Sequence, residues 1–211
     1  MSILAGVRAV LLDMDGTLVD SDGAVDRAWR AWAAASGVPA EALTADLRGY
    51  PGPSTIRRLL PHLPEAELAR SAEALLDLEC TDVDGVVAAP GAGELLAVLA
   101  ARRLPWAVVT GAGRRLARAR LAAAGIVPPL LVSLDDVAVS KPDPECYLKA
   151  AAEIGVVPGE CLVVEDSAPG VAAARAAGIP VAALRGLGGD VPIADLGELA
   201  IRLRAVDGPG A

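Results

Sequence analysis

Residues 10 to 19 read Val-Leu-Leu-Asp-Met-Asp-Gly-Thr-Leu-Val, and they are the most informative ten residues of the chain. An apolar run, Val7 to Leu12, ends in Asp13 and Asp15, with one residue between the two aspartates. Open α/β sheets bind their ligands at the C-terminal tips of their strands, where such carboxylates would lie. If the chain turns after Asp13, the second carboxylate can reach over the first. The stretch therefore predicts a buried strand that leads directly into a polar site.

Five short apolar runs predict buried strands, because each run is continuous, as in a parallel sheet covered on both faces. Helical patterns separate the later four runs, and this alternation predicts an α/β fold with a doubly wound, five-stranded parallel sheet. The strands are expected at Val7–Leu12, Trp106–Thr110, Leu130–Leu134, Cys161–Glu165 and Pro180–Leu184. The helices of this core are expected at Gly91–Arg102, Gly113–Ala124, Pro142–Ile154 and Ala168–Ala177.

The segment after the first strand is longer than one crossover requires, and its pattern is helical throughout. The simplest interpretation is a small α-helical cap over the sheet edge. We expect the catalytic core at residues 1–18 and 87–211, and the cap at residues 19–86. Asp20 and Ser21 are expected to cap the first cap helix. The cap helices are expected at Asp22–Ser36, Ala40–Leu47, Ser54–Leu60 and Glu65–Leu78.

Composition limits the possible partners and the compartment. The net charge of −8 argues against nucleic acid and anionic membranes. The three cysteines lie far apart and form no C-x-x-C pair, which suits a reducing compartment. The longest uncharged run, Leu121 to Leu134, has 14 residues, whereas a bilayer requires ~20. We therefore expect a soluble, cytoplasmic protein, a monomer, with no nucleic-acid or membrane partner.

Six polar side chains share one position in the pattern, since each follows a predicted strand. They are Asp13, Asp15, Thr110, Lys141, Glu165 and Asp166. Parallel strands end at one edge, so these groups are expected to converge there. Four carboxylates cannot all ionise side by side without a cation. With oxygen ligands and no nearby histidine or thiolate, that cation should be Mg²⁺, with Mn²⁺ tolerated.

A magnesium ion among carboxylates, with phosphate-binding groups around it, is typical of phosphoryl transfer. The Thr110 hydroxyl can donate to a phosphate oxygen, and the small Gly111 lets backbone N–H groups approach it. Lys141 supplies a positive charge, and it is one of two lysines among 19 basic residues.

At these positions the chain resembles the haloacid dehalogenase superfamily of aspartate-nucleophile phosphohydrolases. Four motifs carry the resemblance, in the family's order and spacing over nearly the whole chain. They are Asp13-Met14-Asp15-Gly16-Thr17, Val109-Thr110-Gly111, Lys141-Pro142 and Glu165-Asp166. The insertion resembles the helical C1 cap, and the motifs resemble those of sugar- and polyol-phosphate phosphatases, a group that is similar to β-phosphoglucomutase and phosphoglycolate phosphatase. The resemblance implies an enzyme, a Mg²⁺-dependent phosphomonoesterase of a small phosphorylated metabolite.

The resemblance also implies roles for individual residues. Asp13 would attack phosphorus to form an aspartyl phosphate, and Asp15 would protonate the leaving alcohol and later activate water. Thr110 and Lys141 would bind the phosphate. The metal ligands would be Asp13, the backbone carbonyl of Asp15, Asp166, and Glu165 directly or through water. The substrate-binding residues would be Gly16, Thr17, Arg48, Tyr50 and Gly111.

Two departures from the family pattern bear on how phosphate and substrate are bound. Gly111 stands where Ser or Asn is usual, so one side-chain contact to phosphate is lost. Arg48 stands where a histidine often precedes the glycine of the cap loop, which leaves the substrate open.

Several alternative functions stay open to different degrees. Hexose-phosphate mutases are the strongest, but their cap loop carries an arginine where Gly49-Tyr50-Pro51-Gly52-Pro53 offers glycine or proline. Asp15 disfavours dehalogenases, and the absence of lysine before Lys141 excludes phosphonatase chemistry unless another residue replaces it. A phosphorylatable signalling domain would give Asp15 no role, and an inactive binding relative would not need intact motifs.

Overall fold

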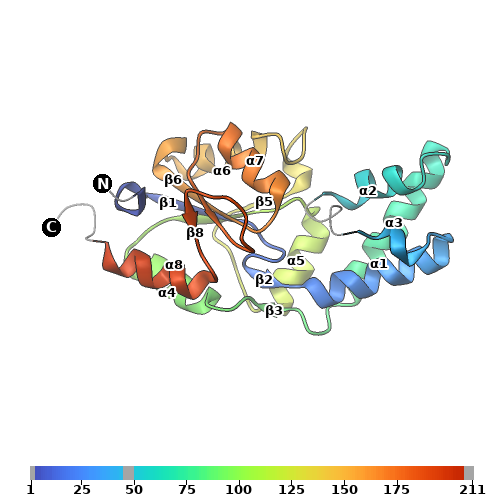
Figure 1. Cartoon of the computed structure of the whole chain (residues 1–211), viewed down its shortest axis with the longest axis horizontal. Coiled ribbons are helices and arrows are strands. Elements are labelled where there is room, and N and C mark those ends of the chain that lie inside the picture. Colours follow the sequence, from blue (N-terminus) through green and yellow to red (C-terminus); the bar gives the residue numbers. More distant parts are fainter. Residues whose placement is uncertain (1–2, 45–49, 207–211) are drawn as a thin grey trace.

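A computed structural model describes residues 3–44 and 50–206 of the chain. Its centre is a parallel sheet of six strands in the order β5-β4-β1-β6-β7-β8, which confirms the doubly wound α/β class (Figure 1). In sheet order the strands are β5 (Leu131–Val132), β4 (Trp106–Val109), β1 (Ala9–Leu12), β6 (Cys161–Glu165), β7 (Val181–Ala183) and β8 (Val191–Pro192). The first strand therefore lies in the middle, flanked by β4 and β6.

Strand β1 shows why its sequence is apolar without alternation. Its four residues are fully buried. Val10 and Leu12 pack into one apolar cluster, whereas Ala9 and Leu11 pack into a second cluster on the other face of the sheet. Successive side chains of a strand point to opposite faces, so a strand covered on both sides must be apolar at every position.

Five helices cover the two faces of the sheet. Helices α4, α5 and α8 contribute to the cluster that contains Leu12, and helices α6 and α7 contribute to the other (Figure 1). These helices are α4 (Ala92–Ala101), α5 (Arg114–Ala123), α6 (Glu145–Ile154), α7 (Ala168–Ala176) and α8 (Leu196–Ala205). Short 3-10 helices lie at Ile3–Gly6, Ala40–Ala42, Leu134–Asp136 and Pro158–Glu160. Among the residues that the structure describes, no helix is both long and apolar enough to cross a membrane.

Three helices form a separate group at one end of the molecule: α1 (Asp22–Ser36), α2 (Gly52–Leu59) and α3 (Glu65–Thr81) (Figure 1). They have their own apolar cluster, centred on Trp32, Ile56 and Leu75. A two-stranded antiparallel ribbon, β2 (Val19–Asp20) with β3 (Val87–Ala88), lies where the chain leaves the sheet and where it returns. We keep the name "cap" for helices α1–α3.

The number of strands and one cap helix differ from the prediction. The sheet has a sixth strand, Val191–Pro192, which is too short for its pattern to be recognised and contains a proline. The helix expected at Ala40–Leu47 is wrong over its described part, which is a single 3-10 turn at Ala40–Ala42. Leu43 leaves the helical backbone conformation, with φ −82° and ψ 74°, so the turn cannot propagate.

Candidate active site

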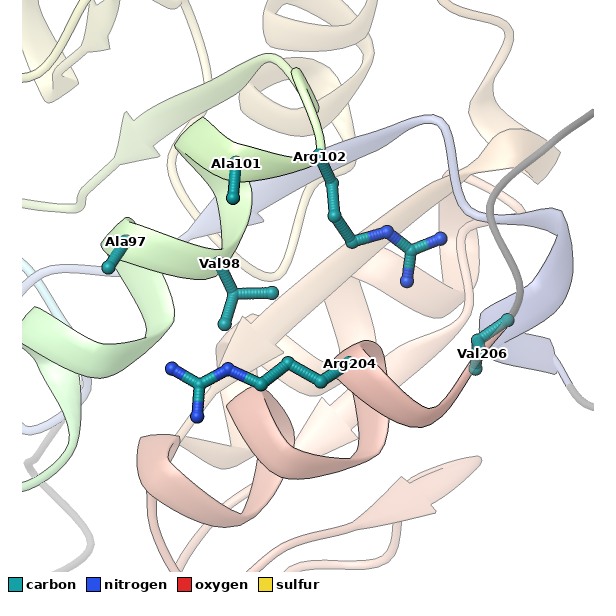
Figure 2. Close-up of a pocket in the computed structure, with 6 residues that line it drawn as sticks. All are labelled: Ala97, Val98, Ala101, Arg102, Arg204 and Val206. Atoms are coloured by element: carbon teal, nitrogen blue, oxygen red, sulfur yellow. The ribbon is translucent and has the colours of Figure 1, made fainter. Parts of the chain in front are cut away.

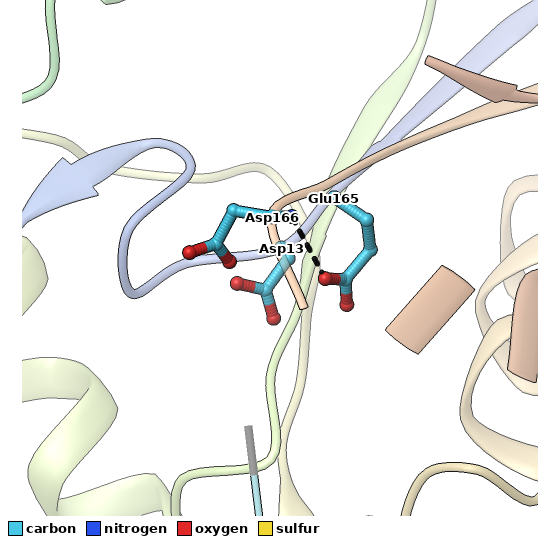
Figure 3. Close-up of side chains that lie close together, drawn as sticks. All are labelled: Asp13, Glu165 and Asp166. Atoms are coloured by element: carbon cyan, nitrogen blue, oxygen red, sulfur yellow. Dashed lines mark hydrogen bonds between the residues drawn. The ribbon is translucent and has the colours of Figure 1, made fainter. Parts of the chain in front are cut away.

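Three carboxylates converge at the C-terminal ends of the two central strands. Asp13 follows β1, Glu165 ends β6, and Asp166 comes next. Each offers an oxygen, and these oxygens all lie within 4.8 Å of one another. Figure 3 shows the Asp13 carboxylate between those of Asp166 and Glu165. The predicted convergence at this sheet edge therefore holds for three of the four acidic residues.

Lys141 joins two of these carboxylates. It lies in the segment between the 3-10 turn Leu134–Asp136 and α6, and its peptide bond to Pro142 is cis. Its Nζ donates to Asp13 Oδ1 at 2.6 Å, to Glu165 Oε1 at 2.7 Å and to the carbonyl of Val109 at 3.1 Å. The side chain is only 4% exposed. All three ammonium protons thus have an acceptor, and the charge is fixed beside Asp13.

Glu165 is held by donors on both of its oxygens. Oε1 accepts from Lys141 and, at 2.8 Å, from the Tyr147 hydroxyl. Oε2 accepts from the backbone N–H groups of Asp166 and Ser167, at 3.0 Å each, and from the Ser167 hydroxyl at 2.9 Å. A carboxylate has about four lone-pair sites. Glu165 therefore has little capacity left for a metal ion, and its contacts favour a role in orienting Lys141.

The carboxylates perturb one another's protonation. Burial, together with the neighbouring carboxylates, raises the pKa of Asp13 despite Lys141, and burial raises the pKa of Asp166 to about 6. Burial alone would lower the pKa of Lys141, but Asp13 and Glu165 outweigh it and raise that pKa. Burial opposes ionisation of Glu165 as well, but Lys141 holds the pKa of this carboxyl below its ordinary value. Asp13 and Asp166 thus lie where an added cation would be stabilised.

Asp166 lies in a tight space that the first motif provides. The Thr17 hydroxyl donates to Oδ1 at 3.3 Å, and Arg185 Nε lies 2.8 Å from Oδ2. Gly16 has φ +78°, and a Cβ there would lie 2.2 Å from Asp166 Oδ2. Glycine is therefore required at position 16 both by the backbone conformation and by the approach of this carboxylate.

The Asp15 carboxylate is not part of this cluster. Its Oδ1 accepts from the Ser21 hydroxyl at 2.7 Å, and its Oδ2 lies 2.7 Å from Arg120. The expected convergence of four carboxylates is therefore wrong for Asp15, because Ser21 and Arg120 bind this carboxylate outside the cluster. The predicted capping by Ser21 is also wrong. Ser21 occupies the N-cap position of α1, but its hydroxyl donates to the carboxylate instead of capping the helix.

The phosphate-binding candidates follow β4. Thr110 is buried, and its hydroxyl oxygen accepts from the backbone N–H of Ala112 at 3.1 Å. At Gly111 a Cβ would meet nothing within 4 Å. The glycine at position 111 is therefore not required by packing, and a side chain there would enter open space.

The cap candidates lie apart from the carboxylates or outside the described residues. Tyr50 is 40% exposed, and the Arg58 guanidinium lies 5.7 Å from the centre of its ring. No contact joins Tyr50 to Asp13, Glu165 or Asp166 among the described interactions. Arg48 falls within residues 45–49, which lie outside the described residues.

The sequence interpretation missed three residues that contact the predicted ones: Tyr147, Arg120 and Arg185. Tyr147 is buried in the structure. The sequence did carry a signal for it, because it is one of two tyrosines in the chain and follows Lys141 by six residues. Arg120 lies on the apolar face of α5, which is unusual for arginine, but the many arginines of this chain hide that signal.

A cavity of about 320 Å³ lies elsewhere, among the last turns of α4 and α8 (Figure 2). None of the predicted site residues lines it. It is lined by Ala97, Val98, Ala101, Arg102, Arg204 and Val206. In a doubly wound fold the C-terminal ends of the helices lie opposite the strand ends that bind ligands. We therefore place the candidate active site at the carboxylates and not in this cavity.

The fold and this site define a class of protein: a doubly wound α/β core with a buried aspartate beside a lysine and two further carboxylates at the sheet edge. The model of the family described as haloacid dehalogenase-like hydrolase matches residues 7–178. The chain belongs to that family. The prediction of an enzyme of this family, a phosphatase, is confirmed by this match and by the names of its relatives.

Two relatives and one solved structure illustrate the similarity. The chain is 39% identical over 178 residues to hexitol phosphatase A of Escherichia coli (strain K12), covering 84% of this chain and 82% of that protein. It is 37% identical to the plasmid-encoded phosphoglycolate phosphatase of Cupriavidus necator, covering 84% and 80%. The crystal structure of CbbY from Rhodobacter sphaeroides in complex with phosphate superposes with a TM-score of 0.77. It is 28% identical, covering 92% of this chain and 96% of that chain.

Proposed function

We propose that the protein hydrolyses the phosphate monoester of a small sugar or polyol through an aspartyl phosphate on Asp13. One observation carries the proposal: the Lys141 ammonium lies 2.6 Å from Asp13 Oδ1, with Asp166 beside them. A carboxylate fixed by a buried ammonium is oriented for attack on phosphorus, and the same ammonium can neutralise charge on the transferring group.

The remaining steps are assigned to side chains near Asp13. The Thr110 hydroxyl and the backbone N–H groups that follow it would donate to the phosphate oxygens. Asp15 would give a proton to the leaving alcohol and afterwards take one from the water that attacks the aspartyl phosphate. Glu165 touches Lys141 but has no free oxygen for substrate, so we assign it a positioning role.

The carboxylates of Asp13 and Asp166 fit a Mg²⁺ ion, because they are hard oxygen ligands whose pKa values are raised by burial and by the neighbouring carboxylates. When bound, the ion would neutralise the phosphate charge and help to orient the phosphoryl group. We propose Asp13 and Asp166 as direct ligands, with the backbone carbonyl of Asp15.

The names of the relatives and the structure of the cap support a proposal for the alcohol part of the substrate. Hexitol phosphatase A and phosphoglycolate phosphatase are named for small phosphorylated compounds. Helices α1–α3 form a separate apolar unit joined to the core by the β2–β3 ribbon. We propose that residues 19–86 are a cap domain that selects the alcohol, over a core of residues 1–18 and 87–211.

Asp13→Asn tests the proposal, with Asp84→Asn as the matched control at an exposed aspartate outside the cluster. Phosphate release is measured with Mg²⁺ from 4-nitrophenyl phosphate and from a panel of sugar, polyol and glycolate phosphates. We expect wild type and the control to release phosphate, and Asp13→Asn to lose about 10³-fold or more while it keeps its circular dichroism spectrum. Retained turnover in Asp13→Asn would refute the assignment. Isomerised sugar phosphate without phosphate release would identify a mutase instead.

A further inference from the structure

Arg120 contacts the proposed proton carrier from outside the site. It lies on α5, and its side chain is only 4% exposed. One terminal nitrogen lies 2.7 Å from Asp15 Oδ2, and the other donates to Glu79 Oε1 at 2.9 Å. Its Nε is buried and has no acceptor among the described residues. The guanidinium is therefore held by two carboxylates and not by its own helix.

The two carboxylates belong to different parts of the molecule. Asp15 precedes β2, where the chain leaves the sheet, and Glu79 lies in the last turn of α3, shortly before the chain returns through β3. Helix α3 packs against α5 across the boundary between the cap and the core. Arg120 therefore connects the proton carrier with the cap helix that lies next to the return strand.

This connection is stiff on both sides. Ser21 fixes the other oxygen of Asp15, so both oxygens of this carboxylate are engaged. On the cap side, Arg27 of α1 binds Asp82 through two hydrogen bonds of 2.7 and 2.8 Å, which ties the end of α3 to α1. Glu79 is 11% exposed, and burial raises its pKa although Arg120 opposes this. Breaking a buried pair of this kind is costly, so a shift of α3 cannot leave Arg120 unaffected.

We propose that Arg120 is a positioning residue that sets the orientation of Asp15 and couples it, through Glu79, to the position of the cap. The proposal rests on the function proposed above, since it assumes that Asp15 carries the proton. When α3 shifts relative to α5, the Arg120 guanidinium must either move with Glu79 or lose its contact with Glu79. In either case the contact between Arg120 and the Asp15 carboxylate changes. Cap position and proton transfer to the leaving alcohol would then change together.

The test compares two aryl phosphates that differ in their need for a proton. 4-Nitrophenolate leaves readily without one, whereas phenolate requires general-acid help, which typically contributes 10²–10⁴-fold. We measure kcat/KM, which reports phosphoryl transfer from substrate to enzyme, for phenyl phosphate and 4-nitrophenyl phosphate with Mg²⁺. Arg120→Met should lower the value for phenyl phosphate about 10-fold more than that for 4-nitrophenyl phosphate, in the same direction as Asp15→Ala.

Arg115→Met is the matched control. Arg115 is on the same helix and binds the same cap helix through Glu73 and Asp77, but these pairs are exposed and do not touch Asp15. We expect its ratio of the two kcat/KM values to equal that of wild type. Arg120→Lys keeps a charge, so its ratio should lie between those of Arg120→Met and wild type. Glu79→Gln should change the ratio in the same direction as Arg120→Met, but by less. The double variant Arg120→Met/Glu79→Gln should have the same ratio as Arg120→Met alone, because both changes break the same connection.

The outcomes separate the two proposals. If Arg120→Met leaves the ratio unchanged, or if Arg115→Met changes it equally, the coupling is refuted. If Arg120→Met does not fold by circular dichroism and thermal melting, Glu79→Gln and Arg120→Lys decide the question, and an unchanged ratio in both refutes it. Asp13→Asn is assayed in parallel. Turnover in that variant refutes the proposed function itself, whereas an inactive Asp13→Asn with an unchanged Arg120→Met ratio refutes only the coupling.

Discussion

Asp166→Asn should stabilise the metal-free protein at pH 8. Burial raises the pKa of Asp166 to about 6 from an ordinary value of 3.8, and its side chain is only 12% exposed. The folded state therefore binds more protons than the unfolded state between about pH 4 and 6, and the free energy of unfolding falls as the pH rises through this window. Above the window, the ionised carboxylate costs about 3 kcal/mol, at about 1.4 kcal/mol per pKa unit. Asparagine has the same shape and carries no charge.

The pH dependence isolates this charge effect from lost contacts. Asparagine can keep the hydrogen bond from Thr17, whose contribution is nearly independent of pH. The half-exposed Arg185 attracts only the ionised carboxylate, and this attraction is already included in the pKa of about 6. The cost of ionisation is about 1.6 kcal/mol at pH 5 and about 3 kcal/mol at pH 8. The stability of Asp166→Asn relative to wild type should therefore rise by about 1.4 kcal/mol from pH 5 to pH 8.

The assay is urea unfolding in EDTA at pH 5, 6, 7 and 8, followed by circular dichroism. Added Mg²⁺ should then stabilise wild type at pH 8 more than Asp166→Asn, because the ion binds ionised carboxylates. A difference between the two proteins that stays flat from pH 5 to pH 8 would show that Asp166 is not destabilised by burial in the way the structure indicates.

Two glycine substitutions follow from the space around them. Gly170→Ala should lower stability by about 1–3 kcal/mol and reduce phosphatase activity, because a Cβ there would lie 1.7 Å from Glu165 Oε1. Gly93→Ala in α4 is the control, since a Cβ there would meet nothing within 4 Å, and this variant should be more stable than wild type by about 0.5–1 kcal/mol. Thermal melting of both variants measures the two effects, and equal effects on stability would contradict the prediction. Gly111→Ser should fold normally and strengthen inhibition by inorganic phosphate about 10-fold, because its hydroxyl would enter the open space at position 111, next in the chain to Thr110. An unchanged inhibition constant would show that this space does not face the phosphate.

The sequence was sufficient for those features that depend on strand burial and order. Continuous apolar runs marked β1, β4 and β6, and the order of the motifs placed Asp13, Thr110 and Glu165 at their ends. Parallel topology then brings these ends to one edge whatever the detailed packing. Helix α1 was also predicted with its observed bounds, and in the structure it ends at Gly37, which adopts the left-handed conformation that commonly ends helices.

The sequence was insufficient where a side chain chooses between competing partners. Ser21 can cap α1 or donate to Asp15, and both are local options for a serine at that position. Asp15 can face the metal ligands or a buried arginine that is 105 residues away in the chain. Glu165 can ligate a cation or accept five hydrogen bonds. Spacing along the chain does not rank these alternatives, since they differ only in three-dimensional contacts.

These contacts give the two aspartates of the first motif opposite environments. Asp13 is buried beside other carboxylates, and the Lys141 ammonium that contacts it offsets the charge of its ionised form. Asp15 faces Ser21 and Arg120, and through Arg120 it is tied to Glu79 of the cap. A nucleophile benefits from a rigid position, whereas a proton carrier must serve two successive steps. Lys141, in the rigid core, would fix the position of Asp13. Arg120, which also contacts the cap, would let the position of Asp15 change between the two steps, although the two aspartates are only two positions apart.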